Sequence, residues 1–368
     1  MDLKLEIFVS VIKKIILLSI IIVVGKSDSA TIDVQTGIDF WGVPGHQVRY
    51  LPNYSTPQEF HNTSEFFKGI VKHEFTDELS VDGKVRYSNV DGMYIDQASV
   101  KYRTEYVAFR AGVLPYRATW CEYLNYDSPW IKEPDAFCSY KMLADSVNSG
   151  SGVQLVSSIS KFGWIFDGQI GYYDNMLYNQ SKTQGAVYVK TGEYTYDKRY
   201  GISLNAVSAT TGNQVRLSYI TATQSINGQN PRDYNFDIIF AGLEINQIQD
   251  LSIKITATSY IGSQLNPKTS LTNYMATSLS GSVLYRLTES DQISLGINKV
   301  SNRTVYILSN YTQPLDVPTY SIAYRHNFNN NIYIKLQGMQ SSSSYQQINK
   351  PMVKTNGVAG GIELGITF

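Results

Sequence analysis

The chain closes with the stretch GVAGGIELGITF, residues 357–368, in which two kinds of residue alternate without a break. Apart from Gly360, every even position is apolar: Val358, Ile362, Leu364, Ile366 and Phe368. The odd positions carry small or polar residues, among them Glu363. Because successive side chains of a β-strand point to opposite faces, this stretch predicts a strand with one oily face and one polar face.

The same alternation recurs along the chain, and the helical pattern is missing almost everywhere. For example, Leu251, Ile253 and Ile255 alternate with Ser252 and Lys254. Counting such segments predicts an all-β chain of about sixteen strands. We expect them at residues 31–41, 66–75, 79–88, 93–102, 106–111, 152–159, 164–173, 199–206, 214–223, 234–245, 251–261, 274–287, 292–300, 318–328, 332–341 and 356–368. Strand 234–245 is ambiguous, since Asp237 and Glu244 fall on opposite faces.

The connections between these segments alternate in length. Short polar turns such as 76–78, 288–291 and 329–331 are separated by long irregular stretches such as 42–65 and 174–198. An even number of amphipathic strands with this alternation is typical of a transmembrane antiparallel β-barrel, with short periplasmic turns and long extracellular loops. In lipid, unpaired backbone groups are so costly that a sheet crosses only when closed on itself. A secreted β-sandwich or a solenoid would need no such alternation, and no fixed repeat period is present.

The amino-terminal segment favours export. Lys13 and Lys14 precede an apolar run from Ile15 to Val24 that only Ser19 interrupts. Ten residues at helical rise reach roughly 15 Å, about half of a hydrocarbon core, so a signal peptide is favoured over a membrane anchor. We expect residues 1–30 to be this peptide, with cleavage between 25 and 30, and residues 31–368 to form one barrel domain.

Charge and motifs exclude several classes of function. The chain has 31 Lys+Arg against 31 Asp+Glu, whereas a nucleic-acid binder usually carries a basic excess. No G-x-S-x-G elbow, H-E-x-x-H pair or metal-spaced cluster occurs. Of the four histidines, His73 and His326 have the outward parity near strand ends, and His46 and His61 fall in the first long loop. We therefore expect no enzyme, no cofactor and no metal.

The longest loop, about 112–151, carries the most informative motif. Its segment 110–140 resembles Gram-negative outer-membrane porins, and in particular a gammaproteobacterial porin-like group with a sixteen-stranded barrel. The matching residues are Arg110, Gly112, Leu114, Pro115, Glu122, Tyr123, Leu124, Pro129, Trp130, Ile131 and Pro134. The resemblance implies that this loop folds inward and constricts the barrel, that the protein forms a homotrimer, and that Leu364, Ile366 and Phe368 form a terminal signal read by the outer-membrane assembly machinery.

Cys121 and Cys138 are the two cysteines of the chain, and both lie in this loop. In an oxidising periplasm we expect them to form a disulfide, which would close a ring of about 18 residues and contribute on the order of 3 kcal/mol. The porin pattern does not require these cysteines, and two free thiols remain the alternative.

Charges at inward parity predict the character of the pore. The expected wall cations outnumber the acids and are Lys68, Lys72, Lys84, Arg86, Lys101, Arg103, Arg110, Arg216, Lys254, Arg286, Arg325 and Lys335. The expected wall acids are Asp33, Asp39, Glu74, Asp82, Asp167 and Glu363. The constriction adds Arg117 and Lys132 against Glu122, Asp127, Glu133 and Asp135, which reduces the basic excess. Rings of one sign bias conduction, so we expect weak anion preference, although the charges are alternatively only solvated.

The predicted function is a porin: a water-filled channel in the Gram-negative outer membrane for passive diffusion of ions and small hydrophilic solutes. The expected surroundings are outer-membrane lipid and lipopolysaccharide. A substrate-selective sugar or anion channel is one alternative, since Tyr123, Tyr126 and Trp130 either begin an aromatic slide or wedge the loop against the wall. A barrel-type surface receptor or adhesin is the other.

Overall fold

The structure is a computed structural model that describes residues 30–46, 58–88, 92–115, 128–131, 149–176, 192–228, 232–264, 272–306, 312–329, 331–345 and 353–367. The sixteen strands are β1 (Ala30–His46), β2 (Gln58–Glu74), β3 (Leu79–Ser88), β4 (Gly92–Arg103), β5 (Val107–Pro115), β6 (Ser149–Lys161), β7 (Trp164–Met176), β8 (Gly192–Ser208), β9 (Gln214–Gly228), β10 (Arg232–Ile248), β11 (Leu251–Gln264), β12 (Thr272–Arg286), β13 (Asp291–Tyr306), β14 (Thr312–Asn327), β15 (Ile332–Tyr345) and β16 (Val353–Thr367). Within these ranges, no helix is long and apolar enough to cross a membrane.

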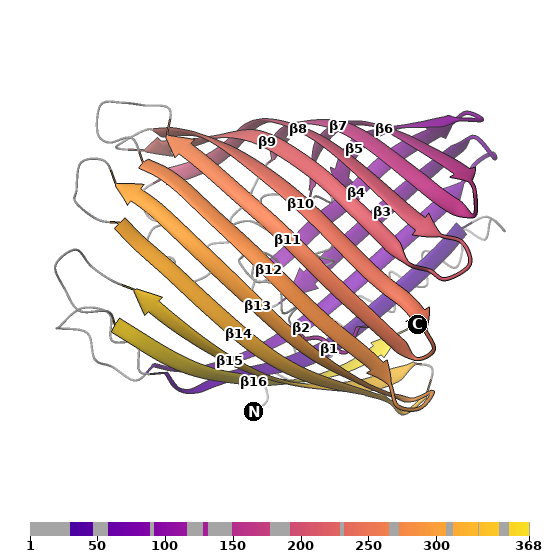
Figure 1. Ribbon diagram of the computed structural model, residues 1–368. Helices are drawn as coiled ribbons and strands as arrows, with labels where there is room; N and C mark the ends of the chain where they lie inside the picture. The colour runs from indigo at the N-terminus through magenta and orange to yellow at the C-terminus, as the bar shows by residue number, and fades with distance from the viewer. Residues whose placement is uncertain are drawn as a thin grey trace, which may run out of the picture.

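The strands form one closed antiparallel barrel, as the alternation predicted. Each strand pairs with its neighbours in sequence, and β1 pairs with β16 to close the ring. At that closing pair Ile38 lies opposite Leu364 and Asp39 lies opposite Glu363. All strands are tilted in the same sense relative to the barrel axis (Figure 1). The closure leaves no unpaired sheet edge.

Several strands are longer than the alternation predicted. β2 begins at Gln58 rather than 66, and β8 begins at Gly192 rather than 199. A 17-residue strand tilted by about 45° rises roughly 40 Å, whereas an apolar band is about 25 Å tall. Backbone pairing therefore continues past the band, where side chains need not alternate. The expected loop 112–151 is correspondingly shorter, since β5 ends at Pro115 and β6 begins at Ser149.

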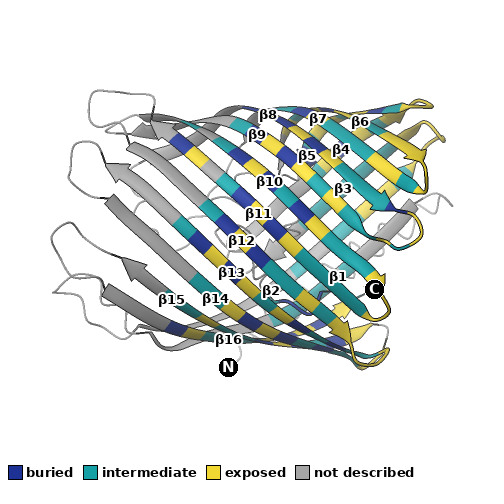
Figure 2. Ribbon diagram, viewed as in Figure 1, coloured by how far each residue is buried: buried dark blue, intermediate teal, exposed yellow. Residues whose placement is uncertain are grey.

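The outer face of the barrel is apolar and the inner face is polar. On β13, Leu295 and Ile297 are 55% and 50% exposed, whereas Ser294 and Asn298 are buried. The same alternation of exposed and buried residues runs along the other strands (Figure 2). The barrel thus inverts the usual order of a water-soluble protein, as expected if hydrocarbon surrounds it.

The terminal strand follows the predicted parity. Ile362, Leu364 and Ile366 are exposed on the outer face, and Glu363 is buried on the inner face. Phe368, the last residue of the expected assembly signal, lies outside the described residues.

Two of the short turns share one design. After β2, the Phe75 amide donates to the Leu79 carbonyl at 2.9 Å, and after β14 the Phe328 amide donates to the Ile332 carbonyl at 2.9 Å. A histidine two residues before each phenylalanine meets its ring edge-on: the centroids of His73 and Phe75 are 4.4 Å apart, and those of His326 and Phe328 are 4.7 Å apart. Such outer aromatic pairs at strand ends are typical of an interfacial girdle.

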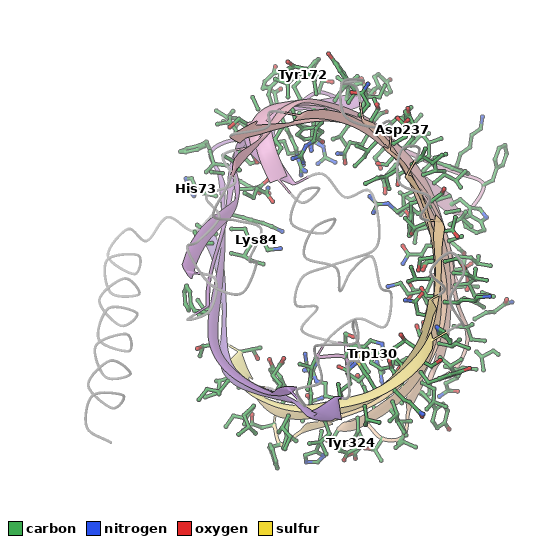
Figure 3. The ribbon with its side chains drawn as sticks, turned by 90° about the vertical axis from the view of Figure 1, so that its left-hand side faces the viewer. His73, Lys84, Trp130, Tyr172, Asp237 and Tyr324 are labelled. Atoms are coloured by element: carbon green, nitrogen blue, oxygen red, sulfur yellow. The ribbon has the colours of Figure 1, made fainter. Side chains whose placement is uncertain are left out.

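The structure decides which face of strand β10 points inward, a question that the sequence left open. Asp237 lies on the outer face, where its carboxylate accepts a hydrogen bond of 2.8 Å from the Tyr219 hydroxyl (Figure 3). Ile238 and Phe240 have the opposite parity and are buried. Alternation alone did not decide this strand because both of its faces carry apolar residues.

Candidate pore lining and constriction

Part of the predicted basic wall lines one hollow on the inner face. Five cations from β2, β3, β4, β5 and β9 surround it, together with three acids from β2, β3 and β7. We call this group of eight side chains the basic alcove: Lys72, Lys84, Lys101, Arg110, Arg216, Glu74, Asp82 and Asp167. The hollow has a volume of about 540 Å³. Figure 3 shows Lys84 pointing into the interior of the barrel.

Two of these cations face each other across neighbouring strands. Lys101 on β4 lies directly opposite Arg110 on β5. Arg110 approaches Asp82 at 3.8 Å, a long contact for an ion pair. Directly opposed like charges are destabilising in a sheet, so the alcove holds cations in a costly arrangement.

The opposite part of the wall is organised differently. Arg325 on β14, Lys335 on β15 and Glu363 on β16 lie opposite one another in register. We call these three residues the seam ladder, because Asp39 of β1 continues the row in register across the closing pair. Lys335 Nζ lies 3.0 Å from Glu363 Oε1, and both side chains are 1% exposed.

Tyr333 connects the members of the seam ladder. Its hydroxyl donates to Glu363 at 2.9 Å, while Arg325 and Lys335 lie over its ring at 4.7 and 5.1 Å from the centroid. The ring rests on Gly365 of β16, where an added Cβ would lie 2.1 Å from a ring carbon. A glycine is therefore required there by close approach rather than by its backbone dihedrals.

A short piece of the long loop covers the seam ladder. Segment 128–131 lies inside the barrel, and Trp130 points from the interior toward the wall (Figure 3). The Ile131 amide donates to Gln337 Oε1 at 2.9 Å, and Lys335 Nζ lies 3.5 Å from the Trp130 carbonyl. Ser128, Pro129 and Trp130 are buried. Trp130 is thus buried against the wall, whereas Tyr123 and Tyr126, the other two residues of the expected slide or wedge, lie outside the described residues.

The remaining predicted wall cations divide into three groups. Lys254 on β11 lies opposite Glu244 of β10. Arg103 and Arg286 are exposed at the ends of β4 and β12, next to turns rather than deep in the barrel. The side chain of Arg86 lies outside the part of the chain that the structure describes, as does that of Lys68.

Most of the expected constriction lies outside the described residues. This applies to Arg117, Glu122, Asp127, Lys132, Glu133 and Asp135, and to both cysteines of the expected disulfide, Cys121 and Cys138. Arg110 is the described member of that group, and it belongs to the wall rather than to the loop.

Tyr333 and Gln337 received no role from the sequence, although their parity placed them on the inner face. The strand pairing did contain an indication for Tyr333. This inward aromatic residue pairs with Gly365, and an aromatic residue opposite a glycine indicates that the ring lies over the neighbouring strand. Nothing local in the sequence indicates that Gln337 accepts a hydrogen bond from a residue 206 positions away.

Within the described ranges, no three His, Cys, Asp or Glu side chains gather as metal ligands. Two acids of the described inner wall have close partners: Glu363 lies opposite Lys335, and Glu244 accepts hydrogen bonds from Gln214, Asn246 and Ser252.

The fold defined by these observations is that of outer-membrane β-barrels, and solved structures of that class resemble the chain over more than nine-tenths of its length. DcaP, an outer membrane channel of Acinetobacter baumannii, matches at 9% identity with a TM-score of 0.63, covering 93% of this chain and 99% of that one. An anion-selective porin from Comamonas acidovorans matches at 11% identity with a TM-score of 0.57, covering 92% and 98%.

OmpT, an outer membrane protein of Vibrio cholerae in its trimer form, matches at 13% identity with a TM-score of 0.57, covering 93% of this chain and 100% of that one. At these identities the likeness establishes the fold alone. No protein-family model matches the chain. No curated protein matches it either.

Proposed function

We propose that this protein is a porin of the Gram-negative outer membrane, which forms a water-filled channel for passive diffusion of ions and small hydrophilic solutes. The observation that carries the proposal is the closed barrel with an apolar outer face and a charged inner face. An apolar exterior is stable in hydrocarbon. Charged side chains on the inner face would be costly to bury without water, so they favour a water-filled interior.

Segment 128–131 supports a channel that the long loop narrows. It is bound to the inner face of β15, far around the ring from β5, from which the loop departs. A loop that crosses the interior in this way reduces the cross-section, and we propose that it forms the constriction of the pore. The basic alcove lies on β2 to β5 and β7 to β9 and supports weak anion preference.

The remaining features of the proposal follow from the sequence and the resemblance. We propose that residues 1–30 are removed on export, that Cys121 and Cys138 pair, and that Leu364, Ile366 and Phe368 are read by the assembly machinery. We also propose a homotrimer surrounded by outer-membrane lipid and lipopolysaccharide. Non-reducing peptide mapping tests the disulfide, and two alkylatable thiols in the native protein would refute it.

Conductance across a planar bilayer tests the channel itself. Refolded protein should produce stepwise increases in current, and under a potassium chloride gradient the reversal potential should indicate modest chloride preference. Silent bilayers in the presence of folded barrel would exclude a porin. Cation preference would exclude the proposed selectivity while leaving the channel intact.

Liposome swelling with a series of sugars separates the general pore from the selective channel. A smooth fall in rate with solute size is expected for passive diffusion. Saturable uptake of one sugar would instead favour the substrate-selective alternative.

A further inference from the structure

We infer that the basic alcove is a binding site for small anions that carry two or more negative charges on carboxylate or phosphate oxygens. This inference rests on the proposed channel and deepens it, because it adds a saturable site to the wall of a diffusion pore. The argument begins with the opposed pair Lys101 and Arg110.

Lys101 has no counter-charge at contact distance. Within the described residues it makes no hydrogen bond or ion pair, although Asp82 and Glu74 lie near enough to act on it at longer range. Arg110 and Arg103 act on it repulsively. A cation held between like charges on adjacent strands is stabilised by any anion that enters the space between them.

Arg110 is also incompletely satisfied. Its contact with Asp82 uses one terminal nitrogen at 3.8 Å, and its buried Nε has no hydrogen-bond partner. A guanidinium binds oxyanions through two parallel N–H groups, so the unused Nε is the group that a carboxylate or phosphate would take.

The far side of the hollow provides further polar groups. Arg216 on β9 lies opposite Asn205 on β8, and both line the hollow. The side-chain oxygen of Asn205 is buried without a hydrogen-bond partner. A side-chain amide carries both an acceptor oxygen and N–H donors, so Asn205 can accept from a ligand hydroxyl or donate to an oxyanion.

Size and charge limit the ligand class. A hollow of about 540 Å³ is within the range of small-molecule sites, and cations exceed acids on its lining by five to three. A monovalent anion would offset one cation and leave the others opposed. An anion with charges at two or more positions can reach Lys101 and Arg110 together, and its affinity is expected to exceed that of a monovalent one.

The seam ladder shows what the alcove lacks. There Lys335 contacts Glu363 at 3.0 Å and is covered by Trp130. The charge of Lys335 is therefore compensated within the protein. Among the alcove cations Lys72 is exposed, and Lys84, Lys101, Arg110 and Arg216 are half-buried, whereas Lys335 is 1% exposed.

Citrate serves as the test anion and acetate as its monovalent control. In potassium chloride, citrate should reduce the channel current to a plateau in a saturable manner, whereas acetate should not. Lys101→Gln should raise the half-blocking citrate concentration about tenfold, which corresponds to about 1.4 kcal/mol. Lys101→Arg, which keeps the charge, should stay within about twofold of the wild type.

Lys254→Gln provides the matched control, because it removes one cation from the inner wall at a position that lies opposite Glu244. Its half-blocking concentration should remain within about twofold of the wild type. Equal weakening by Lys254→Gln and Lys101→Gln would overturn the site in favour of a diffuse field, and so would a citrate effect that never saturates.

Calorimetric titration of citrate into folded protein in detergent separates this inference from the proposed channel. Binding that Lys101→Gln weakens, in a protein that conducts no ions, would overturn the channel and support the site. Clear conductance steps without citrate binding would overturn the site and leave the channel standing.

Discussion

The basic alcove and the seam ladder occupy two parts of the same inner wall. Both contain opposed cations, but the cations differ in how closely a carboxylate contacts them. Both place cations of neighbouring strands directly opposite each other, as Lys101 with Arg110 and Arg325 with Lys335. In the ladder the next residue in the row is Glu363, which pairs with Lys335 out of contact with water. In the alcove the next residues in the row are Ser80 and Gln154, neither of which carries a charge.

This difference teaches that inward parity is not sufficient to make a charge part of the pore surface. Lys335 has inward parity and is 1% exposed, because segment 128–131 lies on it. Lys335 contacts the Trp130 carbonyl of the loop and Glu363 of the neighbouring strand β16.

The largest difference is expected when one lysine of each region is replaced by methionine. Lys335→Met leaves the buried Glu363 carboxylate without its cation and should lower the free energy of unfolding by about 3 to 5 kcal/mol. Lys101→Met removes a repulsion and should change it by less than about 1 kcal/mol, or raise it. Urea unfolding of the refolded barrels in detergent measures both, and equal losses would remove the distinction.

A smaller loss is expected for Tyr333→Phe. The ring stays on Gly365, but Glu363 loses a donor at 2.9 Å, which should cost about 1 to 3 kcal/mol. Tyr324→Phe is the control, since that tyrosine also donates to a carboxylate, Asp291, but on the outer face. The control should shift the urea midpoint less, and a larger shift for Tyr324→Phe would contradict the assignment of Tyr333.

Gln337→Leu is expected to loosen the loop without unfolding the barrel. The Ile131 amide loses its acceptor, which should weaken local protection by about 1 kcal/mol. Amide hydrogen exchange of residues 128–131 should accelerate, and exchange in the strands should not. Gln97→Leu changes a glutamine next to the alcove and should leave the exchange of 128–131 as it was. Unchanged exchange in Gln337→Leu would show that other contacts hold the segment.

The smallest effect is expected from salt. At 1 M ionic strength the screening length falls to about 3 Å, from about 10 Å at 0.1 M. The repulsion within the hydrated alcove should then weaken, so the stability difference between wild type and Lys101→Met should shrink. The penalty of Lys335→Met should persist, because water and ions do not reach that pair. If high salt abolished the loss of unfolding free energy in Lys335→Met, the seam ladder would have to be accessible to solvent, contrary to its burial.

Alternation was sufficient to predict the class of fold and the direction of most side chains. All sixteen expected strands are present, and the inward parity of Lys335, Arg110 and Glu363 was correct. The predictions that failed have one cause. Polar and apolar residues alternate only where one face of a strand lies against an apolar medium and the other does not. Alternation therefore missed the strand extensions beyond the apolar band, and it did not resolve β10, where Ile238 and Phe240 are apolar on the inner face.

The sequence by itself therefore determined the sheet, its closure and the inner or outer side of most residues, because a two-residue period leaves two choices per strand. The tertiary structure alone decided which inner charges meet water. That outcome depends on Gln337 and Lys335 meeting a loop about two hundred positions away, and on the cross-strand register that leaves Lys101 beside Arg110. The loop contacts have no local pattern, because they arise only when the ring closes and the loop enters it, whereas the pairing of Lys101 with Arg110 is set within the hairpin of β4 and β5.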